Sequence, residues 1–329
     1  MEYRKLSTTD IDVSVVALGC WAFAGDATWG PQDEDAALAT VHAALDAGVN
    51  FFDTAEAYGA GSSELLLGKA LAGRRGEAVI ASKVSGDHLA PAELRQACER
   101  SLRQLNTDYL DLYQIHWANR EIPLAETYGA LEELRSEGKV RAFGVCNFGV
   151  GDLTDLFAVG ACATNQLPYS LLWRAIEYEI RQKCIDHGIG ILCYSPLMQG
   201  LLAGKFATAD EVPEGRARTR HFSKDRAQAV HGEPGCEQET FGALEQIRRI
   251  SGQIEVPMAQ VTLAWLAQQP GVTSILAGAR SPDQILDNVQ AAKVTLPLAV
   301  VAELSAATEQ VKWKLGPNPD MWRAESRFR

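Results

Sequence analysis

Short runs of β-forming residues alternate with helical patterns along most of this chain, and this alternation limits the folds open to it. Eight runs, several almost wholly apolar, are predicted strands: 15–19, 50–54, 78–84, 110–116, 140–147, 164–169, 190–196 and 274–279. Segments with apolar residues at i, i+3 and i+4 are predicted helices: 33–48, 62–71, 90–105, 123–138, 149–157 and 175–188. Because apolar strands need cover on both faces, the pattern predicts an α/β protein with a parallel sheet.

Eight such units in 329 residues favour a closed (β/α)8 barrel, a TIM barrel, over a doubly wound sheet. The doubly wound alternative carries a G-x-G-x-x-G fingerprint in its first β/α turn, and residues 18–30 have none. Residues 3–15 predict a short β-hairpin at the barrel floor. Residues 198–235 predict a long loop after the seventh strand, and residues 312–329 a tail over the barrel mouth. We expect one domain over residues 1–329.

The composition argues against several classes of function. A formal net charge of −11 disfavours a nucleic-acid partner, which would need a concentrated basic face. The seven cysteines form no C-x-x-C pair and the six histidines no H-x-H or H-E-x-x-H spacing, so no metal site is predicted. No signal peptide or membrane-spanning run is evident. We therefore expect a cytoplasmic protein with reduced, mostly buried cysteines and no membrane partner; a homo-oligomer is compatible with the sequence.

Four titratable side chains lie at or just beyond the ends of three consecutive predicted strands. They are Asp53, Tyr58, Lys83 and His116. Each alone has a structural explanation, such as capping or packing, but the carboxyl ends of barrel strands converge on the face where active sites of this fold lie. A lysine inside an apolar strand needs an anion to offset its desolvation. Asp53, one strand away, is the expected partner of Lys83.

A cation beside a phenol lowers the phenol pKa, so we expect the pKa of Tyr58 to fall and its proton to become transferable near neutral pH. His116 is expected to hydrogen-bond the same substrate oxygen. Such a group of residues suits a carbonyl that becomes an alkoxide while another species delivers hydride.

The stretch Gly59-Ala60-Gly61-Ser62-Ser63-Glu64 looks like an incomplete dinucleotide fingerprint. It follows the second predicted strand instead of the first, and it lacks the third glycine. We therefore interpret it as a turn into a helix capped by Ser62 and Glu64.

The motifs that hold these residues, DTAEAYG, ASK and LYQIH, resemble the catalytic tetrad of the aldo-keto reductases. GVxNF, NQxxY, YSPLxxGLLxGK and GARSxxQ follow in family order, so the resemblance covers nearly the whole chain. It implies a (β/α)8 barrel and an NADP(H)-dependent oxidoreductase without a metal. Such an enzyme reduces aldehyde or ketone carbonyls to alcohols, or runs the reverse reaction. Tyr58 would be the proton donor, Lys83 its activator, Asp53 the partner of Lys83, and His116 the residue that orients the carbonyl.

The same resemblance implies a cofactor site. Asn147 and Gln166 would bind the nicotinamide carboxamide, and Tyr194 would stack on the ring. The pyrophosphate would be held by Ser195, Leu197, Gln199, Gly200 and Lys205, and the adenosine end by Gly278, Arg280, Ser281, Gln284 and Asn288. A guanidinium and helix N-terminal amides suit a 2′-phosphate, so Arg280 and Ser281 favour NADP(H) over NAD(H).

Two details of the cofactor site are specific to this chain. Cys146 stands where the family commonly has serine, which weakens or removes a hydroxyl contact to the carboxamide. Arg216, Arg218 and Arg220 recur at a spacing of two, and either one of them clamps the pyrophosphate or all are solvated charges.

The aromatic residues Trp21, Trp29 and Trp117 are candidates for the substrate pocket, with Phe23 and Trp322 as further ones. They suit aldehydes, ketones or sugars without choosing among them. Two other functions stay open. One is a cofactor-binding regulatory subunit, as in channel-associated relatives. The other is a Schiff-base aldolase, in which Lys83 would have to be a neutral nucleophile.

Overall fold

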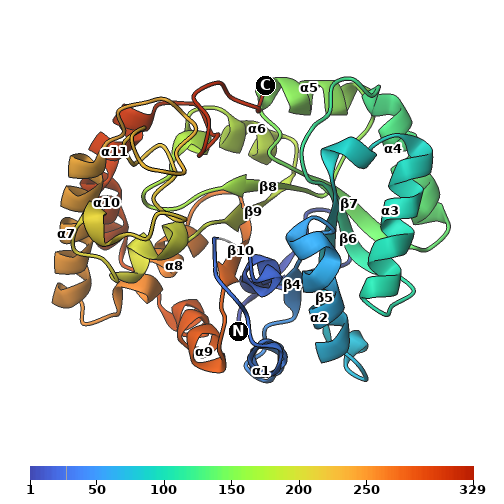
Figure 1. The fold of residues 1–329 in the computed structure, drawn as a ribbon, viewed down its shortest axis with the longest axis horizontal. Helices are drawn as coiled ribbons and strands as arrows, with labels where there is room; N and C mark the ends of the chain where they lie inside the picture. Colours follow the sequence, from blue (N-terminus) through green and yellow to red (C-terminus); the bar gives the residue numbers. More distant parts are fainter. Residues whose placement is uncertain (27) are drawn as a thin grey trace.

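In the computed structural model, which describes residues 1–26 and 28–329, eight parallel strands close into a barrel (Figure 1). Their order around the barrel is β10-β3-β4-β5-β6-β7-β8-β9. The bounds are β3 (Val16–Gly19), β4 (Phe51–Asp53), β5 (Val79–Val84), β6 (Leu110–Ile115), β7 (Val140–Cys146), β8 (Thr164–Pro168), β9 (Gly190–Tyr194) and β10 (Val272–Gly278). Each lies within or overlaps a predicted strand, and the predicted (β/α)8 barrel is confirmed.

Helices surround the barrel, as Figure 1 shows. They are α1 (Glu34–Asp46), α2 (Ser62–Ala70), α3 (Pro91–Gln104), α4 (Leu124–Ser136), α5 (Val150–Val159), α6 (Ile180–Asp186), α7 (Glu237–Gln253), α8 (Met258–Ala267), α9 (Pro282–Gln290), α10 (Leu298–Ala307) and α11 (Glu309–Leu315). Short 3-10 turns are η1 (Cys20–Ala24), η2 (Tyr58–Gly61), η3 (Arg75–Glu77), η4 (Gly86–His88), η5 (Ala175–Glu177), η6 (Met198–Ala203), η7 (Ala209–Glu211) and η8 (Ala291–Lys293). The helix expected over 175–188 is divided, because Glu179 leaves the helical region with φ −145°.

An apolar layer fills the part of the barrel interior next to the floor. Alternate strand residues point inward, and those of the layer are Ala17, Phe51, Ala81, Leu112, Ala142, Leu192 and Leu276. Leu6, Ile11 and Val13 join the same cluster from the hairpin of β1 (Tyr3–Lys5) and β2 (Asp12–Ser14). The predicted hairpin therefore closes the barrel floor.

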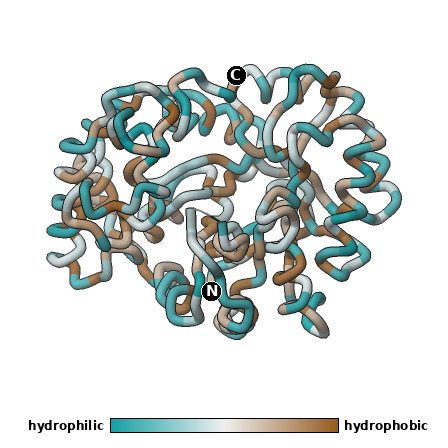
Figure 2. The backbone as a smooth tube through the Cα atoms, in the orientation of Figure 1, coloured by the Kyte–Doolittle hydropathy of each residue, from teal (hydrophilic) through white to brown (hydrophobic). Residues whose placement is uncertain are grey.

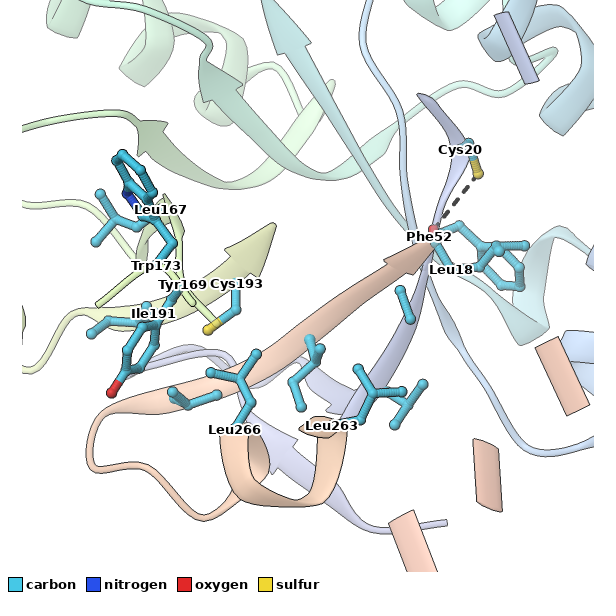
Figure 3. Close-up of a cluster of buried hydrophobic side chains, with 14 of the residues drawn as sticks. Leu18, Cys20, Phe52, Leu167, Tyr169, Trp173, Ile191, Cys193, Leu263 and Leu266 are labelled. Carbon is cyan, nitrogen blue, oxygen red and sulfur yellow. Dashed lines mark hydrogen bonds between the residues drawn. The ribbon is translucent and has the colours of Figure 1, made fainter. Parts of the chain in front are cut away.

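Strand residues of the opposite parity build a second, larger core between the barrel and the helices. Leu18, Phe52 and Ile191 belong to this core, as do Leu263 and Leu266 of α8. Figure 3 shows the two leucines of α8 on the outer side of the strands. In Figure 2 hydrophobic and hydrophilic residues alternate along the outer helices, as in helices with one buried and one exposed face. Both faces of the sheet are buried, as the apolar strand sequences predict.

The predicted capping of α2 by Ser62 and Glu64 is wrong. The N-cap is Gly61, with φ 92°, and no side chain caps the helix. The hydroxyl of Ser62 has no hydrogen-bond partner among the described residues. Glu64 is fully buried and accepts a hydrogen bond from the Ser82 hydroxyl at 2.5 Å. Burial raises the pKa of the Glu64 carboxyl, so this residue is part of the interior and not a helix cap.

The C-terminal tail crosses the barrel mouth from α11 to the N-terminus of α5 (Figure 1). Trp173 donates from its indole nitrogen to the Pro319 carbonyl at 3.2 Å. At the far end, the amide of Gly151 donates to the main-chain oxygen of Arg329 at 2.6 Å. The predicted position of the tail is confirmed, and the tail forms one wall of the mouth.

In the part of the chain that the structure describes, no helix is long and apolar enough to cross a membrane. The described residues also contain no group of three or more His, Cys, Asp or Glu side chains placed to hold a metal ion. Six of the seven cysteines are buried, Cys162 being partly exposed, and all seven are free thiols.

Two helical glycines give a matched test of the packing. A Cβ at Gly68 in α2 would lie 2.7 Å from the main-chain oxygens of Gln104 and Leu105, whereas one at exposed Gly129 in α4 would meet nothing within 4 Å. We expect Gly68→Ala to lower the free energy of unfolding by about 1–3 kcal/mol through overpacking. Gly129→Ala should raise it by about 0.5–1 kcal/mol. Urea denaturation measures both, and equal effects would contradict this packing.

Candidate active site

The polar residues of the site continue the inward alternation of the barrel strands. Asp53 lies two residues after Phe51, Lys83 two after Ala81, and both pairs belong to neighbouring strands. The same step places Gln114, Gln166 and Tyr194 inward on β6, β8 and β9. A polar layer therefore lies above the apolar layer, at the carboxyl ends of the strands.

Lys83 and Asp53 form a buried ion pair at the centre of this layer. The Lys83 ammonium is fully buried and donates to Asp53 Oδ1 at 2.6 Å, to the Thr54 carbonyl at 2.7 Å and to the Tyr58 hydroxyl at 3.2 Å. Burial alone would lower the pKa of Lys83, but the negative charge of Asp53, and that of Tyr58 once its phenol ionises at high pH, raise it above its usual range. The predicted pairing is confirmed, and a charged ammonium opposes the aldolase alternative, which needs a neutral amine.

The second oxygen of Asp53 is held by two amides. Gln166 donates to Oδ2 at 2.8 Å, and Gln114 donates to it at 3.4 Å. Gln114 was not predicted as a site residue, although its inward position two residues after Leu112 is a signal that identifies it. The two amides fix the carboxylate, and through it the direction of the lysine.

Tyr58 lies at the start of η2 with its ring near the Lys83 ammonium, 4.7 Å from nitrogen to ring centroid. The expected fall of its pKa is wrong. Removal of the phenol from water raises the pKa to about 12, because this effect exceeds the lowering by Lys83, while Asp53 adds to the increase. Tyr58 is therefore a protonated phenol at neutral pH, and Lys83 limits the cost of its ionisation.

His116 follows β6 and packs edge-on against Tyr58, with 5.7 Å between the ring centroids. Burial, followed by the charges of Lys83 and Arg327, lowers the pKa of the imidazole to about 3. The ring is therefore neutral at physiological pH and offers one N–H donor and one acceptor.

Asn147 and Tyr194 are hydrogen-bonded to each other on the wall of the site. The Tyr194 hydroxyl donates to Asn147 Oδ1 at 2.9 Å, and Asn147 Nδ2 donates to the His116 carbonyl at 3.0 Å. The Tyr194 ring also lies parallel to the ring of Trp322 in the tail, with ring centroids 6.3 Å apart. The tail thus completes the wall around the aromatic residue expected to stack on nicotinamide.

One cavity of ≈ 1060 Å³ joins most of the predicted site residues. Its lining includes the tetrad members Asp53, Tyr58 and His116, the predicted cofactor residues Asn147, Gln166, Tyr194, Ser195, Leu197, Gln199, Gly200, Lys205, Gly278, Arg280, Gln284 and Asn288, and the tryptophans Trp21, Trp29 and Trp117. Lys83 and Ser281 are not in the lining. Lys83 lies behind Tyr58 and contacts its hydroxyl, and the Ser281 hydroxyl accepts from the Gln284 amide as the N-cap of α9.

The three arginines of the long loop after β9 differ in their surroundings. Arg216 and Arg218 line the cavity and have no carboxylate partner among the described residues. Arg220 is buried, forms an ion pair with Glu233 at 2.7 Å and donates to the Leu315 carbonyl at 2.9 Å. Arg220 therefore attaches the loop to the tail, and only the first two face the cavity.

The main chain beside the cavity is strained. Asn147, Ser195, Met198 and Gln199 have φ values of 61°, 52°, 43° and 54°, in the left-handed region that non-glycine residues rarely occupy. Both amide atoms of buried Gln199 lack a hydrogen-bond partner among the described residues. Strain and unpaired buried polar atoms of this kind gather at ligand sites.

The tail contributes residues that the sequence did not mark. Arg323 and Arg327 line the cavity together with Trp322. The guanidinium of Arg327 lies 3.7 Å from the Trp117 ring centroid and forms an ion pair with buried Asp320 at 2.6 Å. Trp117 thus contacts the tail as well as the cavity.

The aldo/keto reductase family model matches residues 15–309. "Aldo-keto reductase YhdN" of Bacillus subtilis (strain 168) is 35% identical over 299 residues, 87% of each chain. The "NADH-specific methylglyoxal reductase" of Escherichia coli (strain K12) is 33% identical and covers 94% of this chain and 100% of its own. The structure of a Klebsiella pneumoniae aldo-keto reductase in complex with NADPH is 29% identical, with TM-score 0.75, covering 100% of this chain and 99% of its own.

The chain therefore belongs to the aldo/keto reductase family. It is an NAD(P)H-dependent oxidoreductase that acts on carbonyl compounds. The residues present fit a dinucleotide. The cavity is lined by the cations Lys205, Arg216, Arg218 and Arg280, none of which has a carboxylate within salt-bridge distance in the described chain, and it contains the unpartnered amide of Gln199.

The low pKa of His116 gives a test of the site's electrostatics. With a pKa near 3, the imidazole should stay neutral from pH 5 to pH 8 because protonation would bury a second cation near Lys83. NMR of ¹⁵N-histidine-labelled protein, with His116→Gln to assign the resonances, should show no titration of His116 in this range. A midpoint near 6.5 would show that the site is wetter and less cationic than described.

Proposed function

We propose that Tyr58 is the proton donor of a carbonyl reduction, supported by Lys83, Asp53 and His116. The observation that carries this proposal is the contact of the Tyr58 hydroxyl with the buried Lys83 ammonium at 3.2 Å, on the wall of the cavity. A phenol in this place is protonated at neutral pH, as an acid catalyst must be, and a cation stands ready to stabilise the phenolate left after proton transfer.

The nicotinamide, when bound, supplies the hydride that reaches the carbonyl carbon. Tyr58 gives its proton to the carbonyl oxygen, which completes the alcohol. The neutral imidazole of His116 donates an N–H to the same oxygen and orients it. Asp53 keeps Lys83 charged, and Gln166 and Gln114 keep Asp53 in place. In the reverse reaction the same groups remove the proton from an alcohol.

For the cofactor we propose NADP(H), bound along the cavity. Asn147, Gln166 and Tyr194 would face the nicotinamide. Ser195, Leu197, Gln199, Gly200 and Lys205, with Arg216 and Arg218, would surround the pyrophosphate. Gly278, Arg280, Ser281, Gln284 and Asn288 would hold the adenosine end. Cations without carboxylate partners on a protein of net charge −11 support a ligand with several phosphates.

Two observations argue against a strong preference of the site for the 2′-phosphate of NADP(H). Asp287 of α9 lines the same cavity as Arg280, and its carboxylate repels a phosphate. The Escherichia coli relative is described as NADH-specific. The choice between the two cofactors thus depends on how freely Arg280 can meet a phosphate.

For the substrate we propose a small aldehyde or ketone, or the corresponding alcohol, held between Trp21, Trp29 and Trp117. Trp21 stacks on Tyr58 with ring centroids 6.2 Å apart and ring planes inclined by 27°, and it lies edge-on to Trp29 at 5.4 Å. Aromatic walls beside a proton donor favour a compact carbonyl compound over a large polar one. Methylglyoxal, the substrate named for the Escherichia coli relative, is a suitable first probe.

The replacement Tyr58→Phe tests the proposed acid. We expect kcat for methylglyoxal reduction with NADPH to fall about 10²- to 10⁴-fold, because only the proton donor is removed. The Kd of NADP⁺ should be unchanged. Stopped-flow absorbance at the reduced nicotinamide band measures the rate. Tyr178→Phe is the matched control, because Tyr178 is exposed and its hydroxyl donates only to the Lys312 carbonyl among the described residues. Full activity in Tyr58→Phe would eliminate Tyr58 as the donor.

A further inference from the structure

The loop between η1 and α1 holds the side chain of Arg280. Arg280 donates from Nε to Gln32 Oε1 at 2.8 Å, from Nη1 to the Trp29 carbonyl at 2.6 Å, and from Nη2 to the Pro31 carbonyl. Gln32 Nε2 returns a hydrogen bond to the Arg280 carbonyl at 3.3 Å. Every guanidinium nitrogen thus has a partner in residues 29–32, which lie 248 positions or more away in the sequence.

We propose that Gln32 is a specificity-determining residue that sets the relative affinity for NADP(H) and NAD(H) by competing with the 2′-phosphate for Arg280. The inference rests on the proposed function in one respect, the assignment of Arg280 to the adenosine end of the cofactor. It adds a residue outside the cofactor motifs, contributed by the first β/α loop.

The competition follows from the kind of acceptors that hold Arg280. All three are neutral oxygens, and Arg280 has no carboxylate partner in the described chain, so its charge is uncompensated. A phosphate is a stronger acceptor for a guanidinium than an amide or carbonyl, and it prefers a bidentate grip. A side-on grip through Nε and one Nη needs the Nε–H that Gln32 Oε1 now accepts, so Gln32 and the phosphate compete for that donor. NAD(H) carries a ribose hydroxyl at this position and leaves the contacts in place.

The loop can lose its contacts to Arg280 without unfolding, because other contacts hold it near its start. Arg218 donates to the Thr28 hydroxyl at 3.3 Å, and the Arg216 guanidinium lies 5.5 Å from the Trp29 ring centroid. Asp26 accepts from the Trp21 indole at 3.1 Å and from the Trp29 amide at 3.1 Å. Gln32 itself is a partly exposed side chain beyond these anchors, so it can be changed without unfolding the loop.

Two replacements of Gln32 are expected to move the affinity in opposite directions. Gln32→Ala removes one acceptor from Arg280 and should tighten NADP⁺ binding about threefold. Gln32→Glu supplies a charged acceptor that holds Arg280 more strongly and repels the phosphate, and it should weaken NADP⁺ binding about tenfold. The Kd of NAD⁺ should stay constant in both variants. Isothermal titration calorimetry of the full chain with each nucleotide measures these values.

Gln182→Ala is the matched control, since Gln182 is an exposed glutamine of α6 that bonds to Asp186. It should alter neither Kd. Equal shifts for NADP⁺ and NAD⁺ in the Gln32 variants, or no shift in both variants, would overturn the inference while leaving the proposed function intact. Failure of the unmodified protein to bind either nucleotide would instead refute the proposed cofactor site, and the inference with it.

Discussion

The buried ion pair of Lys83 and Asp53 is the interaction on which the rest of the site depends. An ammonium removed from water costs several kcal/mol unless its donors and its charge are satisfied. Here all three donors have partners, and two amides fix the carboxylate. These partners come from strands β4, β5, β6 and β8 and from the turn after β4, so the full set of contacts forms only when the barrel is closed. Closure of the fold therefore assembles the catalytic centre.

The polar layer and the apolar core are two consequences of one strand alternation. Phe51 and Asp53 face the same interior, as do Ala81 and Lys83. For this reason the strands and the tetrad could be predicted from the sequence: an apolar strand that ends in a charged residue is visible without coordinates. The pKa of Tyr58 could not be predicted from the sequence, because it depends on how much water the closed mouth of the barrel excludes. The cap of α2 could not be predicted either, because Gly61 is the N-cap and Glu64 turns inward to Ser82.

The mouth of the cavity is built from segments that are far apart in the sequence, and no local sequence pattern predicts that they come into contact. The tail brings Trp322 and Arg327 to Tyr194 and Trp117, and the first β/α loop brings Trp29 and Gln32 to Arg280. Motif resemblance identified Arg280 but not its partner, since the two are far apart in the sequence and Gln32 belongs to no recognised motif. On a protein of net charge −11, these segments leave cations facing the cavity, which suits phosphate-bearing ligands.

Lys83 favours the ionised form of Tyr58 against the effect of burial. The most direct measurement of this effect is the pKa of position 58, read by ¹⁹F NMR after replacement of Tyr58 by 3,5-difluorotyrosine, whose more acidic phenol titrates in an accessible range. The measurement is made with Lys83 present and in Lys83→Met. This electrostatic effect of Lys83 predicts a higher pKa in the Lys83→Met protein, because the charge that stabilises the phenolate is gone. An equal or lower pKa in that protein would contradict it.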